Sequence, residues 1–205
     1  MKLQYLQKIL EEKGLEIFST RELRLLLNIS ESAAYYLLWS YEKKGYVIKL
    51  KRGLYALKSN YPSSYLIGNR LYEPSYISFD TAMSFHHLIP ETIYSVTCAT
   101  NKITREFVAN GIRYAYHRIK KRAFTGYRPL KYDGRVILIA EPEKAVADYL
   151  YYVDLKQRGL HYERMDLKLI NKKKLLEYVK IFQRSGMLKL VDDIYAEFKK
   201  PKRIY

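Results

Sequence analysis

Acidic side chains gather in one stretch of this sequence and raise the question of catalysis. Glu141, Glu143, Asp148 and Asp154 cluster around one predicted helix, with Lys144 among them. Carboxylates that converge with a lysine or a metal ion are typical of nucleases. On a helix, however, Lys144 and Asp148 are four residues apart and form an ordinary stabilising pair. We therefore interpret this helix as structural and expect no catalytic residue, with a nucleic-acid-processing enzyme as the alternative.

Metal and thiol chemistry have weaker signals. His86 and His87 are adjacent, so on a helix they diverge by about 100° and cannot easily share a metal ion. The sequence contains no HExxH or CxxC pattern, and we predict no metal site and no cofactor. His87 is expected to make a structural hydrogen bond. The single cysteine, Cys98, is expected in a buried strand and fits a reducing cytosol.

The charge balance points to an anionic partner. The chain has 205 residues, with 37 basic and 21 acidic side chains and a formal net charge of +16. Nucleic acid or an acidic protein suits this charge. No apolar stretch approaches the roughly 18 to 20 residues that span a bilayer, and the first residues form an amphipathic helix rather than a signal peptide. We expect a cytoplasmic protein with no membrane partner.

Two short helices joined by a tight polar turn are predicted between residues 19 and 45. Ser19 caps the first helix, and Glu22 is placed to complete a capping box with it. Ser30 caps the second helix, and Gly45 ends it, because glycine adopts the left-handed conformation without strain. The apolar face of the second helix contains Ala34, Leu37, Leu38 and Tyr41.

A basic hairpin follows these helices. Residues 47–50 and 54–57 are rich in β-formers and flank the turn Lys51-Arg52-Gly53. This order is typical of a winged helix-turn-helix, in which a helix enters the DNA major groove and the hairpin reaches flanking phosphates. The DNA-binding candidates are polar or basic residues outside the apolar face, namely Ser32, Tyr35, Tyr36, Ser40 and Lys43 on the second helix and Lys49, Lys51 and Arg52 on the hairpin.

The second helix has an unusual composition for a DNA-reading helix. Its first two turns contain no Arg, Asn or Gln, the residue types that contact bases bidentately. We therefore expect readout by DNA shape, by water or by the hairpin. Tyr35 and Tyr36 either contact DNA or pack against the first helix, and Trp39 is expected in the core or at a domain interface. The competing interpretation is a small helical domain with an ordinary charged hairpin.

The whole chain is predicted to be α+β. Residues 1–58 form the winged helix-turn-helix, residues 59–64 a linker, and residues 65–205 an α/β C-terminal domain. That domain has a small mixed sheet (or an antiparallel one) and C-terminal helices. Strands are predicted around residues 76–79, 92–100, 112–118 and 135–140, and helices around residues 64–72, 80–88, 142–153, 171–183 and 186–198.

A second basic surface is predicted within residues 102–135, where ten basic residues stand against two acidic ones. A strand carrying Arg113, Tyr114, Tyr116 and Arg118 would place aromatic and cationic side chains along one sheet surface. This surface suits a second stretch of DNA or an acidic protein. Its candidate residues are Arg113, Arg118, Lys120, Lys121, Arg122 and Arg128.

Two motifs in the second half carry a family resemblance. Residues 74–102, PSYISFDTAMSFHHLIPETIYSVTCATNK, and residues 140–152, AEPEKAVADYLYY, resemble segments of the AbiEi antitoxin family. The preceding hairpin, with Lys-Arg-Gly-Leu-Tyr, is similar to the end of that family's N-terminal domain. The resemblance covers most of the chain up to about residue 154, and the last fifty residues are similar only in being helical.

The resemblance implies a regulator without enzymatic activity. In this family the winged helix binds double-stranded operator DNA and represses its own operon, while the C-terminal domain counters a nucleotidyltransferase-like toxin in a type IV-like system. A stand-alone regulator without a toxin is the alternative. Both a monomer and a dimer on a palindrome are compatible with the sequence.

Overall fold

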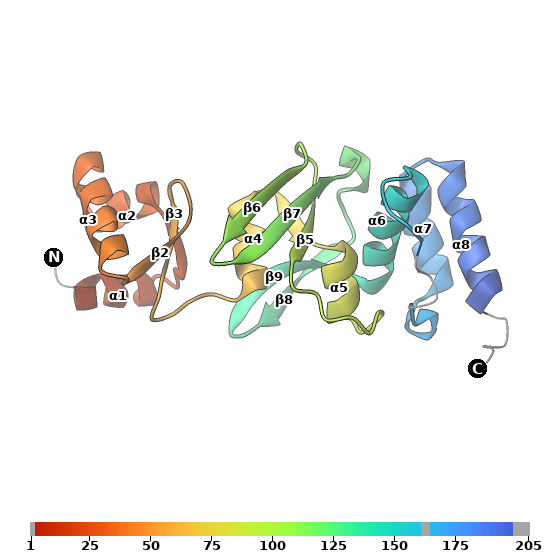
Figure 1. Ribbon diagram of the computed structural model, residues 1–205, viewed down its shortest axis with the longest axis horizontal. Coiled ribbons are helices and arrows are strands. Elements are labelled where there is room, and N and C mark those ends of the chain that lie inside the picture. Colours follow the sequence, from red (N-terminus) through yellow and green to blue (C-terminus); the bar gives the residue numbers. More distant parts are fainter. Residues whose placement is uncertain (1–2, 161–164, 199–205) are drawn as a thin grey trace.

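The computed structural model describes residues 3–160 and 165–198 of the 205-residue chain. Its described elements lie along one axis (Figure 1). A group of helices with a small sheet occupies one end, a larger sheet lies in the middle, and further helices occupy the other end. The fold is mixed α and β, with two separate sheets, as the sequence predicts.

The N-terminal part places three helices beside a small antiparallel sheet. The sheet has the strand order β1-β3-β2. The order of elements is consistent with the expected winged helix-turn-helix. The elements are α1 (Leu3–Glu12), β1 (Ile17–Ser19), α2 (Thr20–Leu27), α3 (Glu31–Lys43), β2 (Val47–Lys51) and β3 (Leu54–Leu57).

The predicted caps are confirmed. The Ser19 hydroxyl accepts a hydrogen bond from the Glu22 amide at 3.1 Å, and the Glu22 carboxylate accepts one from the Ser19 amide at 2.6 Å. The Ser30 hydroxyl accepts from the Ala33 amide at 3.2 Å. Gly45 follows α3 with a φ of +69°. These contacts set the start and end of α3, and therefore which of its side chains face outward.

Strand β3 is buried on both faces because two cores meet at it. Tyr55 and Leu57 pack with the helices α1 to α3, where Leu6 and Leu10 are fully buried, and with the buried Phe18 of β1. The alternate residues of β3, Leu54 and Ala56, pack with the larger core of the C-terminal part. Since the two parts share buried surface, the division of the chain into domains at residues 59–64 stays a prediction.

The C-terminal part is built on a mixed sheet in the order β6-β7-β5-β4-β9-β8. The pairs β5–β7 and β4–β9 are parallel, and the other neighbouring pairs are antiparallel. The strands are β4 (Ser75–Ile77), β5 (Val96–Thr100), β6 (Arg105–Ala109), β7 (Ile112–Arg118), β8 (Tyr127–Tyr132) and β9 (Arg135–Ala140). The helices are α4 (Ser64–Leu71), α5 (Phe79–Phe85), α6 (Pro142–Asp154), α7 (Lys172–Ile181) and α8 (Ser185–Phe198), with short 3₁₀ turns at Lys121–Ala123 and Leu167–Leu169.

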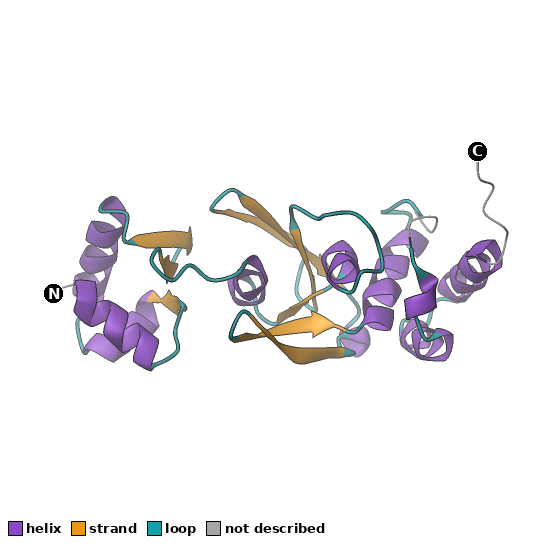
Figure 2. Cartoon of the chain, turned by 90° about the horizontal axis from the view of Figure 1, so that it is seen from below, coloured by secondary structure: helices purple, strands orange, loops and turns teal. Residues whose placement is uncertain are grey.

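Helices α4 and α5 cover opposite faces of the larger sheet. Figure 2 shows α4 on the side toward the N-terminal part, with α5 and α6 on the other side. The Tyr116 hydroxyl donates to the Gly68 carbonyl of α4 at 2.6 Å, whereas Phe79 at the start of α5 contacts the neighbouring His117 ring. Successive residues of β7 therefore point to different helices, as the pleat of a strand requires.

Several expected boundaries were wrong. Strands β6 and β8 are absent from the prediction because they lie at the sheet edges, where exposed side chains remove the apolar pattern. Strand β5 begins at Val96 rather than near residue 92, and α5 ends at Phe85. The Asp80 carboxylate, in the first turn of α5, pairs with Arg158.

A buried ion pair links α6 to strand β4. The Lys144 ammonium donates to the Asp148 carboxylate, and their side chains are only 1% and 0% exposed. The other carboxylate oxygen accepts from the Tyr76 hydroxyl at 2.8 Å and from the Ser78 hydroxyl at 2.7 Å. Desolvation raises the pKa of Asp148 and lowers the pKa of Lys144. The expectation of an ordinary helix-stabilising pair was therefore too simple.

Removal of Asp148 should be costly for the fold. Asp148→Ala leaves the Lys144 ammonium and two hydroxyls buried without their acceptor, and such a change costs about 3 to 5 kcal/mol. We expect the free energy of unfolding to fall by this amount in urea denaturation followed by circular dichroism. Glu106→Ala is the matched control, because Glu106 pairs with Arg113 on the surface at 3.0 Å and such pairs contribute little. Equal midpoints for both variants would contradict the assignment.

Candidate nucleic-acid interface

Helix α3 presents an aromatic and polar ridge to solvent. Its inner face carries Ala34, Leu38 and Tyr41, which are buried. At about 100° per residue, Tyr36 and Trp39 fall on the opposite face, and they are 70% and 51% exposed. Trp39 was expected in the core or at a domain interface, and the structure corrects this. Its helical spacing from Tyr36 was the signal that could have placed it.

The ridge is held together by ring contacts. We define the α3 ridge as Ser32, Tyr36, Trp39 and Lys43. The Tyr36 and Trp39 ring centroids are 5.8 Å apart with an interplanar angle of 32°. The Lys43 ammonium lies 4.1 Å from the Trp39 ring centroid, within cation–π range. These contacts orient the two aromatic rings before any partner binds.

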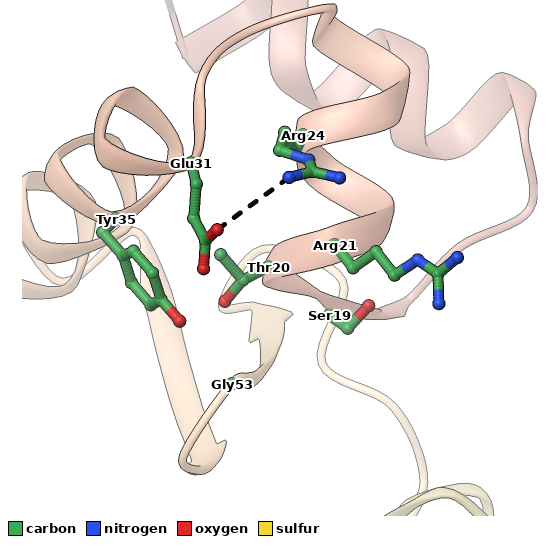
Figure 3. Close-up of a pocket in the computed structure, with 7 residues that line it drawn as sticks. All are labelled: Ser19, Thr20, Arg21, Arg24, Glu31, Tyr35 and Gly53. Atoms are coloured by element: carbon green, nitrogen blue, oxygen red, sulfur yellow. Dashed lines mark ion pairs between the residues drawn. The ribbon is translucent and has the colours of Figure 1, made fainter.

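Tyr35 lies beside the ridge and lines a pocket of about 340 Å³ (Figure 3). The pocket lies between the start of α2, the first turns of α3 and Gly53 of the hairpin. Arg24 on its wall is 3.9 Å from the Glu31 carboxylate, whereas the Arg21 side chain is directed outward in Figure 3. Ser40, on the other flank of α3, is half-buried.

The three basic residues of the hairpin lie in different environments. Lys49 and Arg52 are exposed, so both are available to a partner. Lys51 instead donates its ammonium hydrogen to the Leu71 carbonyl at the end of α4 and lies 5.6 Å from the Phe107 ring centroid. Desolvation is the largest cause lowering the pKa of Lys51. This placement differs from the expected phosphate contact, because Lys51 faces the C-terminal part.

Further ion pairs join the two parts of the chain. Arg70 of α4 contacts Glu22 of α2 at 3.2 Å, and Arg135 of β9 contacts Glu16 at 2.7 Å. Together with Lys51 they fix the orientation of α2 and the hairpin against the larger sheet. The α3 ridge takes no part in these contacts.

Comparison with protein families finds a match to this N-terminal part. Residues 5–58 match the family model described as "Transcriptional regulator, AbiEi antitoxin". The predicted family resemblance is confirmed over these residues. The match runs from α1 through the hairpin and so contains the α3 ridge. No curated protein matches the chain.

The residues predicted to form a second basic surface lie outside the matched segment, and the structure places them apart. Arg113 lies on β7, next to the edge strand β6, whereas Arg128 lies on β8 at the opposite edge of the sheet. Arg113 is paired with Glu106 at 3.0 Å, and Arg118 is exposed at the end of β7. The six candidate residues therefore do not form one patch.

The 3₁₀ turn that follows β7 carries the other basic candidates. Lys120 donates to the Phe182 carbonyl at 2.6 Å, and Arg122 donates to the Gln183 side chain. Lys121 is exposed. Two of these three residues thus hold the turn against the end of α7.

Two aromatic residues of this region were assigned to the wrong face. Tyr114 and Tyr116 are fully buried, and Tyr116 bonds the backbone of α4. They pack in the core because the side of β7 that carries them is covered by α4. The proposed alternation of exposed cations and aromatic rings is therefore not present.

The prediction for the histidines was wrong, and the prediction for the cysteine is confirmed. His86, rather than His87, makes the structural hydrogen bond, with its ring nitrogen 2.8 Å from the Ala140 carbonyl. Cys98 is fully buried in β5 as predicted, and burial raises the pKa of its thiol. Within the described ranges, no cluster of His, Cys, Asp or Glu could hold a metal ion, and no described helix is long and apolar enough to cross a membrane.

Lys51 and Arg52 are neighbours with different roles, which stability measurements can separate. We expect Lys51→Ala to lower the thermal unfolding midpoint, because the Leu71 carbonyl loses a charged hydrogen-bond donor, a loss of about 1 kcal/mol. Arg52→Ala should leave the midpoint unchanged, since Arg52 is exposed. Thermal unfolding followed by circular dichroism makes the comparison. The same midpoint for both variants would refute the placement of Lys51.

Proposed function

We propose that this protein is a cytoplasmic DNA-binding transcriptional regulator that represses its own operon and acts as an antitoxin. Its N-terminal part acts as a winged helix-turn-helix, with α3 in the major groove of double-stranded operator DNA. The observation that carries this proposal is the outward exposure of the α3 ridge, on which Tyr36 and Trp39 are 70% and 51% exposed. The family match over residues 5–58 supports the regulatory role.

Basic residues rim the ridge and suit the DNA backbone. Lys43 at the end of α3 and Lys49 and Arg52 on the hairpin are exposed. Arg21, at the start of α2, is also exposed, and a phosphate that enters the neighbouring pocket would lie near it. Such contacts give affinity that falls steeply with salt, because each neutralised phosphate releases a counterion.

The antitoxin role concerns the C-terminal part. The matched family is named for antitoxins as well as regulators, and we propose a nucleotidyltransferase-like toxin as the target. The exposed cations Arg118, Lys121 and Arg128 lie at separate places on the sheet and its turn. They therefore suit an extended protein or nucleic-acid surface rather than a compact anion.

A nuclease is the alternative from a different class, and the geometry of α6 does not favour it. Lys144 and Asp148 are buried within the core. Glu143 accepts from the Asn171 amide at 3.1 Å, and Glu141 pairs with Lys174 at 3.0 Å. Each of these acidic groups is engaged in holding α6 against its neighbours, which favours a binding protein.

Electrophoretic mobility shift at two salt concentrations tests the regulator half. We expect the full chain to bind its own upstream DNA in preference to unrelated DNA. Lys49→Ala/Arg52→Ala should weaken binding and reduce the slope of log K against log salt by about 2, one for each lost phosphate contact. Lys173→Ala/Lys189→Ala is the matched control, since it removes the same charge from exposed positions on α7 and α8. Absence of preferential binding would refute the proposal, and equal weakening by both variants would refute this interface.

Growth rescue tests the antitoxin half. We expect an adjacent gene to encode a nucleotidyltransferase-like protein, and we expect co-expression of the full chain to restore growth of cells that express it. The Lys49→Ala/Arg52→Ala variant should rescue equally, because the antitoxin activity is assigned to the C-terminal part. Growth in the absence and presence of each chain is measured from a foreign promoter, so that repression plays no part. Failure of the wild-type chain to rescue leaves the stand-alone regulator as the better proposal.

A further inference from the structure

The surface of α3 lacks the side chains that usually identify bases by hydrogen bonding. Its thirteen residues, ESAAYYLLWSYEK, include no Arg, Asn or Gln. Guanine is usually read by a bidentate Arg or Lys, and adenine by a bidentate Asn or Gln. The one basic residue of α3, Lys43, lies in its last turn and over the Trp39 ring. Hydrogen-bond readout by this helix is therefore limited.

What α3 offers is apolar surface of a defined shape. Ala33 exposes its methyl group in the first turn, and the Tyr36 and Trp39 rings follow on the ridge. In the major groove the apolar feature that distinguishes one base from the others is the 5-methyl group of thymine. When exposed aromatic rings cover such methyl groups, the complex is stabilised, because apolar surface on both sides is removed from water.

The spacing of the two rings fits neighbouring base pairs. Tyr36 and Trp39 are three residues apart, which is about 4.5 Å along the helix axis. Successive base pairs are about 3.4 Å apart. The ring centroids are 5.8 Å apart, so the two rings reach adjacent or next-adjacent positions without changing their packing.

We propose that the α3 ridge recognises thymine methyl groups, with Tyr36 and Trp39 covering the methyl groups of neighbouring A·T pairs in the operator. Ala33 borders the two rings without covering a methyl group, and the Ser32 hydroxyl, which lies 3.1 Å from the Ser30 hydroxyl, also contacts a base edge or phosphate. This inference rests on the proposed DNA-binding function and names the sequence class that it selects. Duplex DNA is the occupant because the exposed cations Lys43, on the ridge, and Lys49 and Arg52, on the hairpin, match a polyanion.

Replacement of thymine by uracil tests the inference, since it removes the methyl group and keeps the base-pairing edge. Fluorescence anisotropy compares an upstream DNA fragment with its fully deoxyuridine-substituted form. We expect the wild-type chain to bind the uracil fragment about sixteen times more weakly, from about fourfold for each of the two methyl contacts of Tyr36 and Trp39. Tyr36→Ala/Trp39→Ala should bind thymine DNA more weakly and no longer distinguish the two fragments.

The control variant separates the ridge from its basic rim. Lys49→Ala/Arg52→Ala should lose affinity for both fragments and keep the wild-type ratio between them. Because both aromatic residues are exposed, the aromatic variant should keep the wild-type thermal midpoint. Trp39 is also the only tryptophan of the chain, so its emission should be quenched more by thymine DNA than by uracil DNA at saturation.

The possible outcomes distinguish this inference from the proposed function. Preferential binding to the upstream DNA with equal affinity for both fragments overturns methyl recognition and leaves the regulator intact. Discrimination that persists in Tyr36→Ala/Trp39→Ala overturns the assignment to these residues. Binding without preference for the upstream DNA overturns the DNA-binding function on which the inference rests.

Discussion

The buried pair between Lys144 and Asp148 is the interaction on which the C-terminal part depends. It joins α6 to β4 through the hydroxyls of Tyr76 and Ser78. Two charges inside a core are stable only when each is paired and its remaining hydrogen-bonding capacity is filled. This requirement joins two stretches that are far apart in the sequence. Ser78 and Asp148, which contact each other, are 70 positions apart. The centre of the larger sheet and the helix beside it are thereby held in one arrangement.

The N-terminal part is attached to the C-terminal part by apolar packing and by contacts of charged side chains that are not fully buried. One face of β3 packs into the larger core, while Arg70 and Lys51 connect α4 with α2 and the hairpin. All of these contacts lie on the side of the hairpin that faces the C-terminal part. The outward face of α3 is consequently held in a fixed direction but kept free for a partner. The family match ends at residue 58. The outward face of α3, which lies within the match, is thus positioned partly by residues that lie after residue 58.

Local signals allowed the N-terminal elements to be predicted well. Ser19, Ser30 and Gly45 act through contacts within a few residues, which a sequence displays directly. The inner face of α3 was also predictable, since helical periodicity sets it. Trp39 was misassigned to the core or a domain interface, although its spacing of three residues from Tyr36 placed it on the outer face. The edge strands β6 and β8 were missed because their exposed residues carry no regular pattern.

Tertiary contacts could not be predicted in the same way. The adjacent residues Lys51 and Arg52 are both basic, so the sequence does not distinguish them. Only the structure shows that Lys51 contacts a carbonyl of α4 and that Arg52 is exposed to water. The same holds for Tyr114 and Tyr116, whose burial depends on α4 covering that face of β7, and for Arg113 and Arg128, which the strand order separates. The stretches around Ser78 and Asp148 were singled out for a family resemblance, but their meeting in one buried cluster follows only from the fold.

The packed rings of the α3 ridge have a consequence for the rates at which a partner binds and dissociates. Because Tyr36, Trp39 and Lys43 already hold one another in the free protein, docking of this face costs little side-chain conformational entropy. Charges at the rim act over a distance and raise the rate of encounter. Short-range contacts beneath the rings act only after docking and lengthen the life of the complex. Arrival at DNA and departure from it are thus controlled by different side chains, the first by cations of the hairpin and of the end of α3, and the second by the aromatic rings of α3.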